Sequence, residues 1–386
     1  MDKLLISGPA RLHGTLVAGG AKNAALPSLA ACLLTDQPMV LEGVPDVRDI
    51  RTMLRLLGHL GIDHESGDAG LRLEVKREPT ADDAPYDLVK TMRASVLALG
   101  PLLGRLGHAR VSLPGGCAIG VRPIDQHLAG LEALGATVEL EHGYVNARAD
   151  RLRGTHFRFS VATVTGTENL MMAAALADGV TVLDNCAREP EIIDLARLLG
   201  KMGAEIDGAG EERMEIQGSR SLGGATHRVI PDRIETGTYL IGGAITGGDV
   251  TIENGRAEDL GALLEKLAEA GCQIDTEGGG LRLRGTGEIA PKDVVTAPYP
   301  GFPTDLQAQY VALMTQAHGN ATICETVFEN RFQHVSELNR MGAHIEIDGS
   351  YARVHGPAPL SGAKVMATDL RASACLVLAG LAADGE

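Results

Sequence analysis

The sequence has no tryptophan, and aromatic residues make up only 3% of its 386 residues. Its core must therefore be packed mainly from alanine, leucine, valine and isoleucine, and a hydrophobic content of 44% is enough to build large cores. Because a chain of this length exceeds what one compact core usually holds, we expect two domains.

The chain also lacks long apolar segments. No run reaches the roughly 18 residues of a membrane span, and the first residues are too poor in apolar side chains for a secretory signal. These absences predict a soluble protein, and cysteines that look reduced predict a cytoplasmic one.

Positive charge is in deficit, with 35 Lys and Arg against 50 Asp and Glu and a net charge of −15. Such a balance disfavours a general nucleic-acid or anionic-membrane partner, since both require a cationic surface. It leaves open a small anionic substrate held in a local cationic pocket. The sequence identifies no protein partner.

The six cysteines form no CxxC pair and no Cys/His metal spacing, which predicts reduced thiols and no metal site. A P-loop, a dinucleotide-binding fingerprint and a GxSxG elbow are absent as well. We therefore expect no metal and no cofactor.

What the sequence does contain is a repeat. Amphipathic helical patterns end in a glycine that a strand pattern follows, as expected of a left-handed C-terminal cap. The spacing between these glycines is 68 to 74 residues, and they are Gly61, Gly135, Gly203, Gly271 and Gly342.

A second, Ala- and Leu-rich helix type recurs between them. Six such units of roughly 70 residues, each with two helices and several strands, predict an α/β fold of α+β repeats in two groups of three. We place one domain at residues 22–229 and the other at 1–21 with 230–386. The sixth unit is incomplete by some 30 to 35 residues, which suggests a piece of a longer protein. The Ala- and Leu-rich helices are predicted to begin near Asn23, Arg93, Glu168, Glu235, Asp305 and Arg371.

One loop stands out as chemically distinct. The segment 113–127 holds Cys117 behind two glycines and ahead of Arg122, and its glycines and prolines exclude a regular helix or strand. A nearby cation favours the thiolate, so we predict a reactive cysteine, although a lone cysteine is more often a small buried hydrophobe. That second reading fits the other five: Cys32, Cys186, Cys272, Cys324 and Cys375.

Several cations lie at equivalent places in the repeat. Lys22 follows a Gly-Gly pair at a helix start, where its charge can add to free backbone N–H groups and form an anion site. Arg93, Arg331 and Arg371 lie near other unit junctions, and Arg suits planar anions through paired hydrogen bonds. Each of the four is equally explained, taken singly, as a solvated or ion-paired surface residue.

The segment 301–307 contains the best general-base candidate, Asp305. The alternative is that Thr304 or Asp305 only caps the helix that follows. Capping would also keep the carboxylate ionised, as a base requires.

Together these motifs resemble the enolpyruvyl transferases, in collinear order along nearly the whole chain. The resemblance implies two inside-out α/β barrel domains of three repeats each. The motifs are Gly20-Ala-Lys22-Asn23-Ala-Ala-Leu-Pro, Lys90-Thr-Met-Arg93-Ala-Ser, Leu113-Pro-Gly-Gly-Cys117-Ala-Ile-Gly-Val-Arg122-Pro, Ala187-Arg-Glu189-Pro-Glu, Pro300-Gly-Phe-Pro-Thr-Asp305, Glu329-Asn-Arg331-Phe and Thr368-Asp-Leu-Arg371-Ala-Ser.

The resemblance is strongest to members acting on a nucleotide sugar. It implies transfer of the enolpyruvyl group of phosphoenolpyruvate to the 3-hydroxyl of UDP-N-acetylglucosamine with release of phosphate, the first committed step of peptidoglycan synthesis. It implies that Cys117 is the catalytic proton donor and the target of the epoxide fosfomycin, and that Asp305 takes the sugar hydroxyl proton. Implied phosphoenolpyruvate contacts are Lys22, Asn23, Arg122, Arg331 and Arg371; implied nucleotide-sugar contacts are Asn23, Arg93, Arg122, Pro123, Ile124, Asp125, Gln126, Asp305 and Val327.

Two departures from the family pattern qualify this reading. A further arginine near the family's C-terminus is not in this chain, and a lysine often found before the helix at Glu168 is replaced by the segment 160–165. Two alternatives stay open: a transferase acting on shikimate 3-phosphate, which the Cys117 loop argues against, and a truncated protein that binds the nucleotide sugar without turnover.

Overall fold

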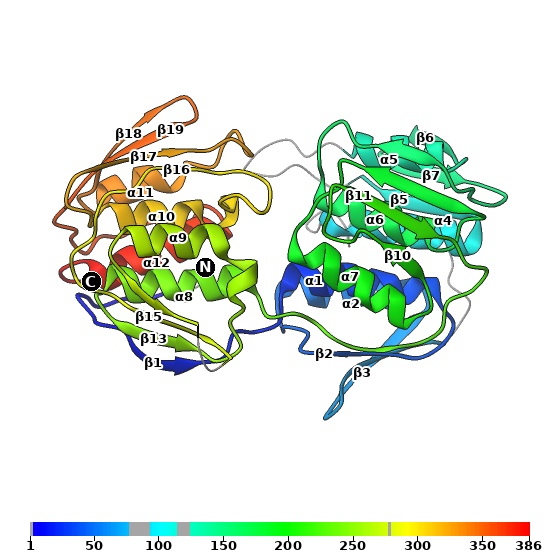
Figure 1. Ribbon diagram of the computed structural model, residues 1–386, viewed down its shortest axis with the longest axis horizontal. Helices are drawn as coiled ribbons and strands as arrows, with labels where there is room; N and C mark the ends of the chain where they lie inside the picture. Colours follow the sequence, from blue (N-terminus) through cyan, green and yellow to red (C-terminus); the bar gives the residue numbers. More distant parts are fainter. Residues whose placement is uncertain (1–2, 77–92, 114–123, 277–278) are drawn as a thin grey trace. The chain divides into compact units, whose positions relative to one another are not determined.

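The computed structural model describes residues 3–76, 93–113, 124–276 and 279–386 (Figure 1). The chain divides into two compact units. The amino-terminal unit comprises the described residues between Gly19 and Ile230, and the carboxy-terminal unit combines the residues up to Ala18 with Pro231–Glu386. The sequence placed the domain limits at residues 22 and 230.

The described part of the amino-terminal unit alternates helices and short strands. Its helices are α1 (Lys22–Ala31), η1 (Cys32–Leu34), α2 (Arg48–His59), η2 (Arg93–Ala98), α4 (Leu99–Leu106), α5 (Asp125–Ala133), α6 (Val164–Ala174) and α7 (Pro190–Lys201). Its strands are β2 (Met39–Glu42), β3 (Ile62–Gly67), β4 (Gly70–Val75), β5 (His108–Ser112), β6 (Thr137–Glu141), β7 (Tyr144–Arg148), β8 (His156–Arg158), β9 (Val180–Asp184), β10 (Glu205–Asp207), β11 (Arg213–Gln217) and β12 (Thr226–Arg228).

The carboxy-terminal unit follows the same alternation. Its helices are α8 (Arg233–Ile245), η3 (Ala257–Asp259), α9 (Gly261–Glu269), η4 (Thr304–Leu306), α10 (Gln307–Met314), α11 (His334–Arg340) and α12 (Leu370–Ala382). Its strands are β1 (His13–Leu16), β13 (Asp249–Ile252), β14 (Gln273–Asp275), β15 (Leu281–Arg284), β16 (Val294–Val295), β17 (Asn320–Cys324), β18 (His344–Asp348) and β19 (Tyr351–His355).

The sheets repeat one topology. In four of them, a strand pairs in parallel with an outer strand on one side and antiparallel with a β-hairpin on the other, giving the orders β12-β2-β4-β3, β8-β9-β11-β10, β1-β13-β15-β14 and β16-β17-β19-β18. A fifth sheet, β5-β7-β6, contains the same antiparallel core among the described residues. The repeat predicted from the sequence is therefore confirmed in the strand order.

Helices, not strands, occupy the centre of each unit. All eight residues of α10 are buried, as are the last nine of α6, so these helices are covered on every side. In the carboxy-terminal unit α8, α10 and α12 contact one another, and Figure 1 shows helices lying between the two sheets. This arrangement is the predicted inside-out barrel. None of the helices in the described part is both long and apolar enough to cross a bilayer.

The five repeat glycines all adopt the left-handed conformation. Each lies two residues after the last residue of α2, α5, α7, α9 or α11, directly after the C-cap residue, with φ between +95° and +104°. A side chain is unfavourable there, because a Cβ atom crowds the backbone at positive φ. The glycines therefore end one helix and direct the chain into the next strand, as the spacing predicted.

Candidate active site

The loop that the sequence singled out lies largely outside the described residues. Cys117, Arg122 and Pro123 belong to residues 114–123, and the side chain of Arg93 is not described either. Their roles stay predictions.

The other five cysteines are buried and free of disulfides, as expected of small apolar core residues. Burial raises the pKa of the Cys32 and Cys186 thiols to about 12 and that of Cys272 to about 11. Thiols with such pKa values stay protonated at neutral pH and are poor nucleophiles. These three cysteines are therefore not suited to a catalytic role.

In the carboxy-terminal unit the structure brings Asp305, Arg331 and Arg371 together. Arg331 Nη2 donates to Asp305 Oδ1 at 2.6 Å, and Arg371 Nη2 donates to Asp305 Oδ2 at 3.0 Å. Asp305 lies in η4, Arg331 precedes α11, and Arg371 is the second residue of α12. Three segments far apart in the sequence thus meet at one carboxylate.

The charges around Asp305 decide its protonation. Burial alone would raise the pKa of this carboxyl, but the charges and hydrogen bonds of Arg371 and Arg331 outweigh burial and hold the pKa well below its usual range. Asp305 is therefore an anion at neutral pH, and a weak base as long as both guanidinium groups hold it.

The Arg331 guanidinium can donate more hydrogen bonds than it makes within the described residues. Its side chain is only 3% exposed, its guanidinium lies 5.2 Å from the centre of the Phe328 ring, and its Nη1 atom has no hydrogen-bond partner within the described residues. A buried donor without a partner costs free energy, and an incoming anion would satisfy it. Arg331 is thus the clearest anion-binding group in the described part of this unit.

The alternative reading, in which Thr304 or Asp305 caps a helix, is wrong. Neither side chain accepts a backbone N–H at the start of η4 or α10. Asp305 turns instead to the two arginines, whose full charges attract a carboxylate more strongly than backbone dipoles do. Thr304 Oγ1 donates to Glu325 Oε2 at 2.8 Å.

Glu325 is a residue that the sequence reasoning missed. It is buried directly after β17, and its Oε1 accepts the backbone N–H groups of Val327 and Phe328 at 2.8 and 3.1 Å. It thereby fixes the turn that carries Val327 and leads to Arg331. The sequence does contain a signal for this role, because Glu325 is a charged residue that follows an apolar strand without an intervening turn residue.

Arg371 owes its position to a helix cap. The Asp369 carboxylate accepts the backbone N–H groups of Arg371 and Ala372 at 2.8 and 3.1 Å, which fixes the first turn of α12. Because Arg371 is in that turn, the cap also sets where its guanidinium can reach.

In the amino-terminal unit Lys22 is ion-paired. Its Nζ atom lies 2.9 Å from Asp49 Oδ2, and the two side chains are 25% and 37% exposed. Lys22 begins α1 and no side chain caps that helix, while Asn23 is exposed beside it. The predicted anion site thus includes a carboxylate from α2, which an anion would have to displace.

The start of α5 presents three more predicted contact residues. Ile124 immediately precedes the helix, and Asp125 and Gln126 begin it. Gln126 Nε2 donates to Asp125 Oδ2 at 3.2 Å, and Gln126 Oε1 accepts the Ser160 backbone N–H at 2.7 Å. The segment that replaces the family lysine therefore packs against this turn, and its Thr163 caps α6.

A buried acid lies near the Ala187-Arg-Glu-Pro-Glu motif. Burial raises the pKa of Glu168 well above its usual range, and the charges of Glu191 and Glu189 add to the effect. Burial therefore favours the neutral carboxylic acid form of Glu168, which can donate a hydrogen bond. Nothing in the sequence pattern singled it out, because its neighbours are 21 and 23 residues away.

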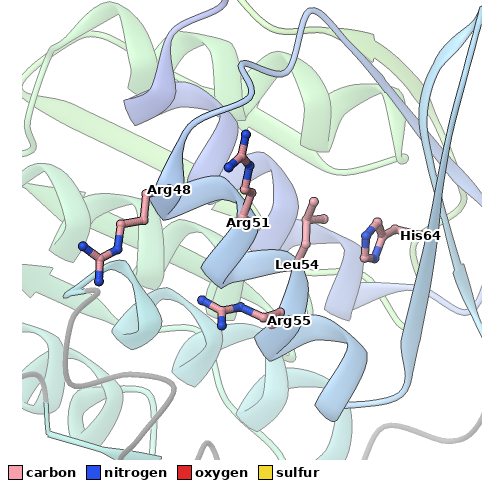
Figure 2. Close-up of a pocket in the computed structure, with 5 residues that line it drawn as sticks. All are labelled: Arg48, Arg51, Leu54, Arg55 and His64. Carbon is pink, nitrogen blue, oxygen red and sulfur yellow. The ribbon is translucent and has the colours of Figure 1, made fainter. Parts of the chain in front are cut away.

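A cationic pocket of about 340 Å³ lies on α2 and β3 (Figure 2). Figure 2 shows three arginines projecting from successive turns of α2, with His64 on the neighbouring strand. Arg51 is held by Asp46 through two hydrogen bonds of 2.6 Å, so its charge is largely neutralised. The lining residues are Arg48, Arg51, Leu54, Arg55 and His64.

The sequence profile of EPSP synthase (3-phosphoshikimate 1-carboxyvinyltransferase) matches residues 6–386. The chain belongs to this enolpyruvyl transferase family. The family resemblance predicted from the motifs is confirmed.

Relatives within the family match the whole of this chain and about nine tenths of their own length. The chain is 58% identical to UDP-N-acetylglucosamine 1-carboxyvinyltransferase of Anaeromyxobacter dehalogenans, covering 100% of this chain and 92% of the relative. It is 56% identical to the protein of the same name from Koribacter versatilis, covering 100% of this chain and 90% of that one.

Solved enolpyruvyl transferases share the fold. The enolpyruvyl transferase NikO from Streptomyces tendae superposes with a TM-score of 0.88 at 26% identity, covering 98% of this chain and 91% of that chain. EPSP synthase from Acinetobacter baumannii has a TM-score of 0.74 at 17% identity, with coverages of 98% and 92%. The predicted two-domain α/β fold is thereby confirmed.

Proposed function

We propose that this enolpyruvyl transferase moves the enolpyruvyl group of phosphoenolpyruvate to the 3-hydroxyl of UDP-N-acetylglucosamine and releases phosphate. The observation that carries the proposal is 56–58% identity, over the full chain, to relatives named UDP-N-acetylglucosamine 1-carboxyvinyltransferase. The Cys117 loop supports it further, because the shikimate enzymes of the family have no equivalent cysteine. The reaction would be the first committed step of peptidoglycan synthesis, in the cytoplasm.

The reaction is an addition followed by an elimination. In the addition, the sugar 3-oxygen bonds to C2 of phosphoenolpyruvate, Asp305 accepts the hydroxyl proton, and Cys117 gives a proton to C3. In the elimination, C3 loses a proton, the C2–phosphate oxygen bond breaks, and the enol double bond returns. Cys117 would also be the thiol that fosfomycin alkylates.

Arg331 and Arg371 are proposed to bind phosphoenolpyruvate. A carboxylate or phosphate can accept two parallel hydrogen bonds from a guanidinium group. Arg331 Nη1 is a buried donor that has no acceptor among the described residues. Lys22, Asn23 and Arg122 are proposed to complete the binding of this anion.

Substrate binding would activate Asp305. While both arginines donate hydrogen bonds to it, the Asp305 carboxylate is a weak base. An anionic substrate that draws Arg331 and Arg371 to itself removes the attraction that depresses the pKa of Asp305, so that its basicity rises. This order of events would suppress proton abstraction until phosphoenolpyruvate is bound.

The nucleotide sugar is proposed to contact residues from several motifs. Two of them, Val327 and Asp305, are adjacent to the Glu325 turn described above. The full proposed set is Asn23, Arg93, Arg122, Pro123, Ile124, Asp125, Gln126, Asp305 and Val327.

The test is release of phosphate from phosphoenolpyruvate by the full chain, with UDP-N-acetylglucosamine or shikimate 3-phosphate as the acceptor. We expect release with the nucleotide sugar only, and loss of at least a hundredfold in rate for Cys117→Ala. Cys186→Ala is the matched control and should retain activity, because Cys186 is a buried core residue.

Three results would contradict the proposal. Release with shikimate 3-phosphate would indicate the other acceptor. Undiminished release by Cys117→Ala would remove the cysteine from the mechanism. Calorimetric binding of UDP-N-acetylglucosamine by a folded chain that releases no phosphate would leave a binding protein without turnover.

A further inference from the structure

The outer face of the sheet β16-β17-β19-β18 carries two histidines and a glutamate that the proposed reaction does not use. His344 and His355 are directly paired across the β18–β19 hairpin, and Glu346 follows two residues after His344 on the same face. The alternate residues Ile345 and Val354 are buried in the core, so the three polar side chains point outward.

The donor atoms of these side chains converge. His344 Nε2 lies 3.7 Å from Glu346 Oε1, and His355 Nε2 lies 3.9 Å from the same oxygen. All three ligand atoms lie within 4.8 Å of one another, and the imidazole rings stack with centroids 4.5 Å apart. Two ligands on one tetrahedral zinc ion are about 3.3 Å apart, so side-chain rotation alone can bring these atoms to bonding positions.

A second observation points to a ligand at His355. Its Nδ1 lies 3.1 Å from Asn320 Oδ1, which can only accept a hydrogen bond, so in the neutral imidazole Nδ1 carries the proton and Nε2 carries the lone pair. That Nε2 atom is buried and has no hydrogen-bond partner among the described residues. An imidazole fixed on one nitrogen by an amide and left with an unsatisfied lone pair on the other is oriented as metal-binding histidines are.

We propose that His344, Glu346 and His355 bind a divalent cation of the zinc class. Two imidazoles with one carboxylate favour zinc over magnesium or calcium, which prefer oxygen ligands only. Arg353, opposite Glu346 on β19, is the cation that opposes binding, and Asp348 lies 3.9 Å from it and offsets its charge.

The bound ion would hold β18 and β19 together at the open end of their hairpin. Binding to the folded state alone stabilises it by mass action. The ion would therefore raise the unfolding temperature of the carboxy-terminal unit. It would not bind to Cys117 or Asp305, the groups proposed to take part in the reaction.

The test is isothermal titration of metal-free protein with ZnCl₂. It uses the full chain in a Cys117→Ser background, because a reactive thiol, as predicted for Cys117, would also bind zinc. We expect one ion per chain, and at least tenfold weaker binding for His344→Ala and for Glu346→Gln. Asn320→Ala should weaken binding by about 10- to 100-fold, the usual effect of removing an outer hydrogen bond to a ligating histidine.

His108→Ala is the matched control, because His108 is also an exposed strand histidine but lies on β5 of the other unit. It should bind zinc as the background protein does. His344 is exposed, so its replacement is not expected to unfold the chain, and circular dichroism checks this. Absence of zinc binding in the background protein, or equal affinity in His344→Ala, would overturn the proposal.

Discussion

At the residue scale, the carboxylate of Asp305 is the clearest case of a group defined by its surroundings. Its two oxygens are divided between Arg331 and Arg371, and Arg331 is almost fully buried. Removing the carboxylate would leave two guanidinium groups close together without a counter-charge. Breaking a buried ion pair in this way typically costs 3–5 kcal/mol.

We therefore predict that Asp305→Asn lowers the free energy of unfolding at pH 7 by about 2–4 kcal/mol, somewhat less than a fully buried pair because Asp305 retains partial exposure. Added inorganic phosphate should restore part of this loss, because it can take the place of the carboxylate between the arginines. Urea denaturation with and without phosphate measures both effects.

The control for that variant is Asp46→Asn, which removes a carboxylate from an exposed arginine, Arg51. Exposed pairs contribute little, so no measurable change is expected. The prediction for Asp305 fails if its variant is as stable as the wild type, or if phosphate stabilises wild type and variant equally.

At the scale of the element, helix caps position the site. Asp232 and Asp369 cap α8 and α12 in the same way, each accepting two backbone N–H groups. The two caps are structurally equivalent, but only α12 carries a proposed substrate-binding residue, Arg371, in its first turn.

We predict that Asp369→Ala and Asp232→Ala each lower the free energy of unfolding by about 1 kcal/mol, the usual value of an N-cap. Only Asp369→Ala should also raise the KM for phosphoenolpyruvate, because it loosens the turn that holds Arg371. Chemical denaturation and steady-state kinetics of both variants separate the two effects. Equal KM values in the two variants would show that the cap does not position Arg371.

The repeat glycines give a second prediction at this scale. Gly203 follows α7 with φ of +103°, and Gly200 lies inside the same helix; an added Cβ atom meets nothing within 4 Å at either position. Conformation alone should therefore decide the outcome. Gly203→Ala should destabilise the protein by about 1–2 kcal/mol, whereas Gly200→Ala should stabilise it by about 0.5–1 kcal/mol.

Thermal denaturation of both alanine variants tests this prediction. Two substitutions of the same chemistry, three residues apart, should shift the unfolding temperature in opposite directions. A shift of the same sign in both would mean that helix propensity or packing, rather than left-handed geometry, dominates at the cap.

At the scale of the whole molecule, each unit has its own apolar core and contains a buried histidine whose pKa is lowered by burial. Burial lowers the pKa of His127 in the amino-terminal unit to about 4, against a smaller opposing effect of Asp125. Burial likewise lowers the pKa of His334 in the carboxy-terminal unit to about 4.

The sign of the pH dependence follows from these values. An unfolded histidine titrates near pH 6.5, so between about pH 6.5 and pH 4 the unfolded chain binds a proton that the folded chain does not. The free energy of unfolding therefore falls as the pH decreases through this range. Above about pH 6.5 the two histidines contribute no pH dependence.

We predict that His127→Gln, which cannot be protonated, flattens the fall in stability between pH 6.5 and 4 in the amino-terminal unit only. Hydrogen exchange at several pH values reports each unit separately. His108→Gln, at an exposed site, should leave the slope unchanged. An unaltered slope in His127→Gln would show that this histidine does not account for acid sensitivity.

Much of the fold was predictable because its signals are local. The glycines after α2, α5, α7, α9 and α11 mark a conformation that the residue itself must adopt. The buried Ala- and Leu-rich helices and the core cysteines follow from composition over a few turns. The family follows from collinear motifs. All of these features can be read along the chain without knowing which segments meet.

The electrostatic partners were decided by the tertiary structure alone. A helix cap was the alternative role considered for Asp305, and its carboxylate instead meets Arg371, 66 residues away. Lys22 pairs with Asp49, and Glu168 lies beside two other acids. A charged side chain interacts with the groups that tertiary packing places within a few ångströms of it. No periodicity in the sequence encodes the distance between two such side chains. The sequence determined the repeat, the helix ends and the family; only the packing of distant segments decided which charges meet and which protonation states result.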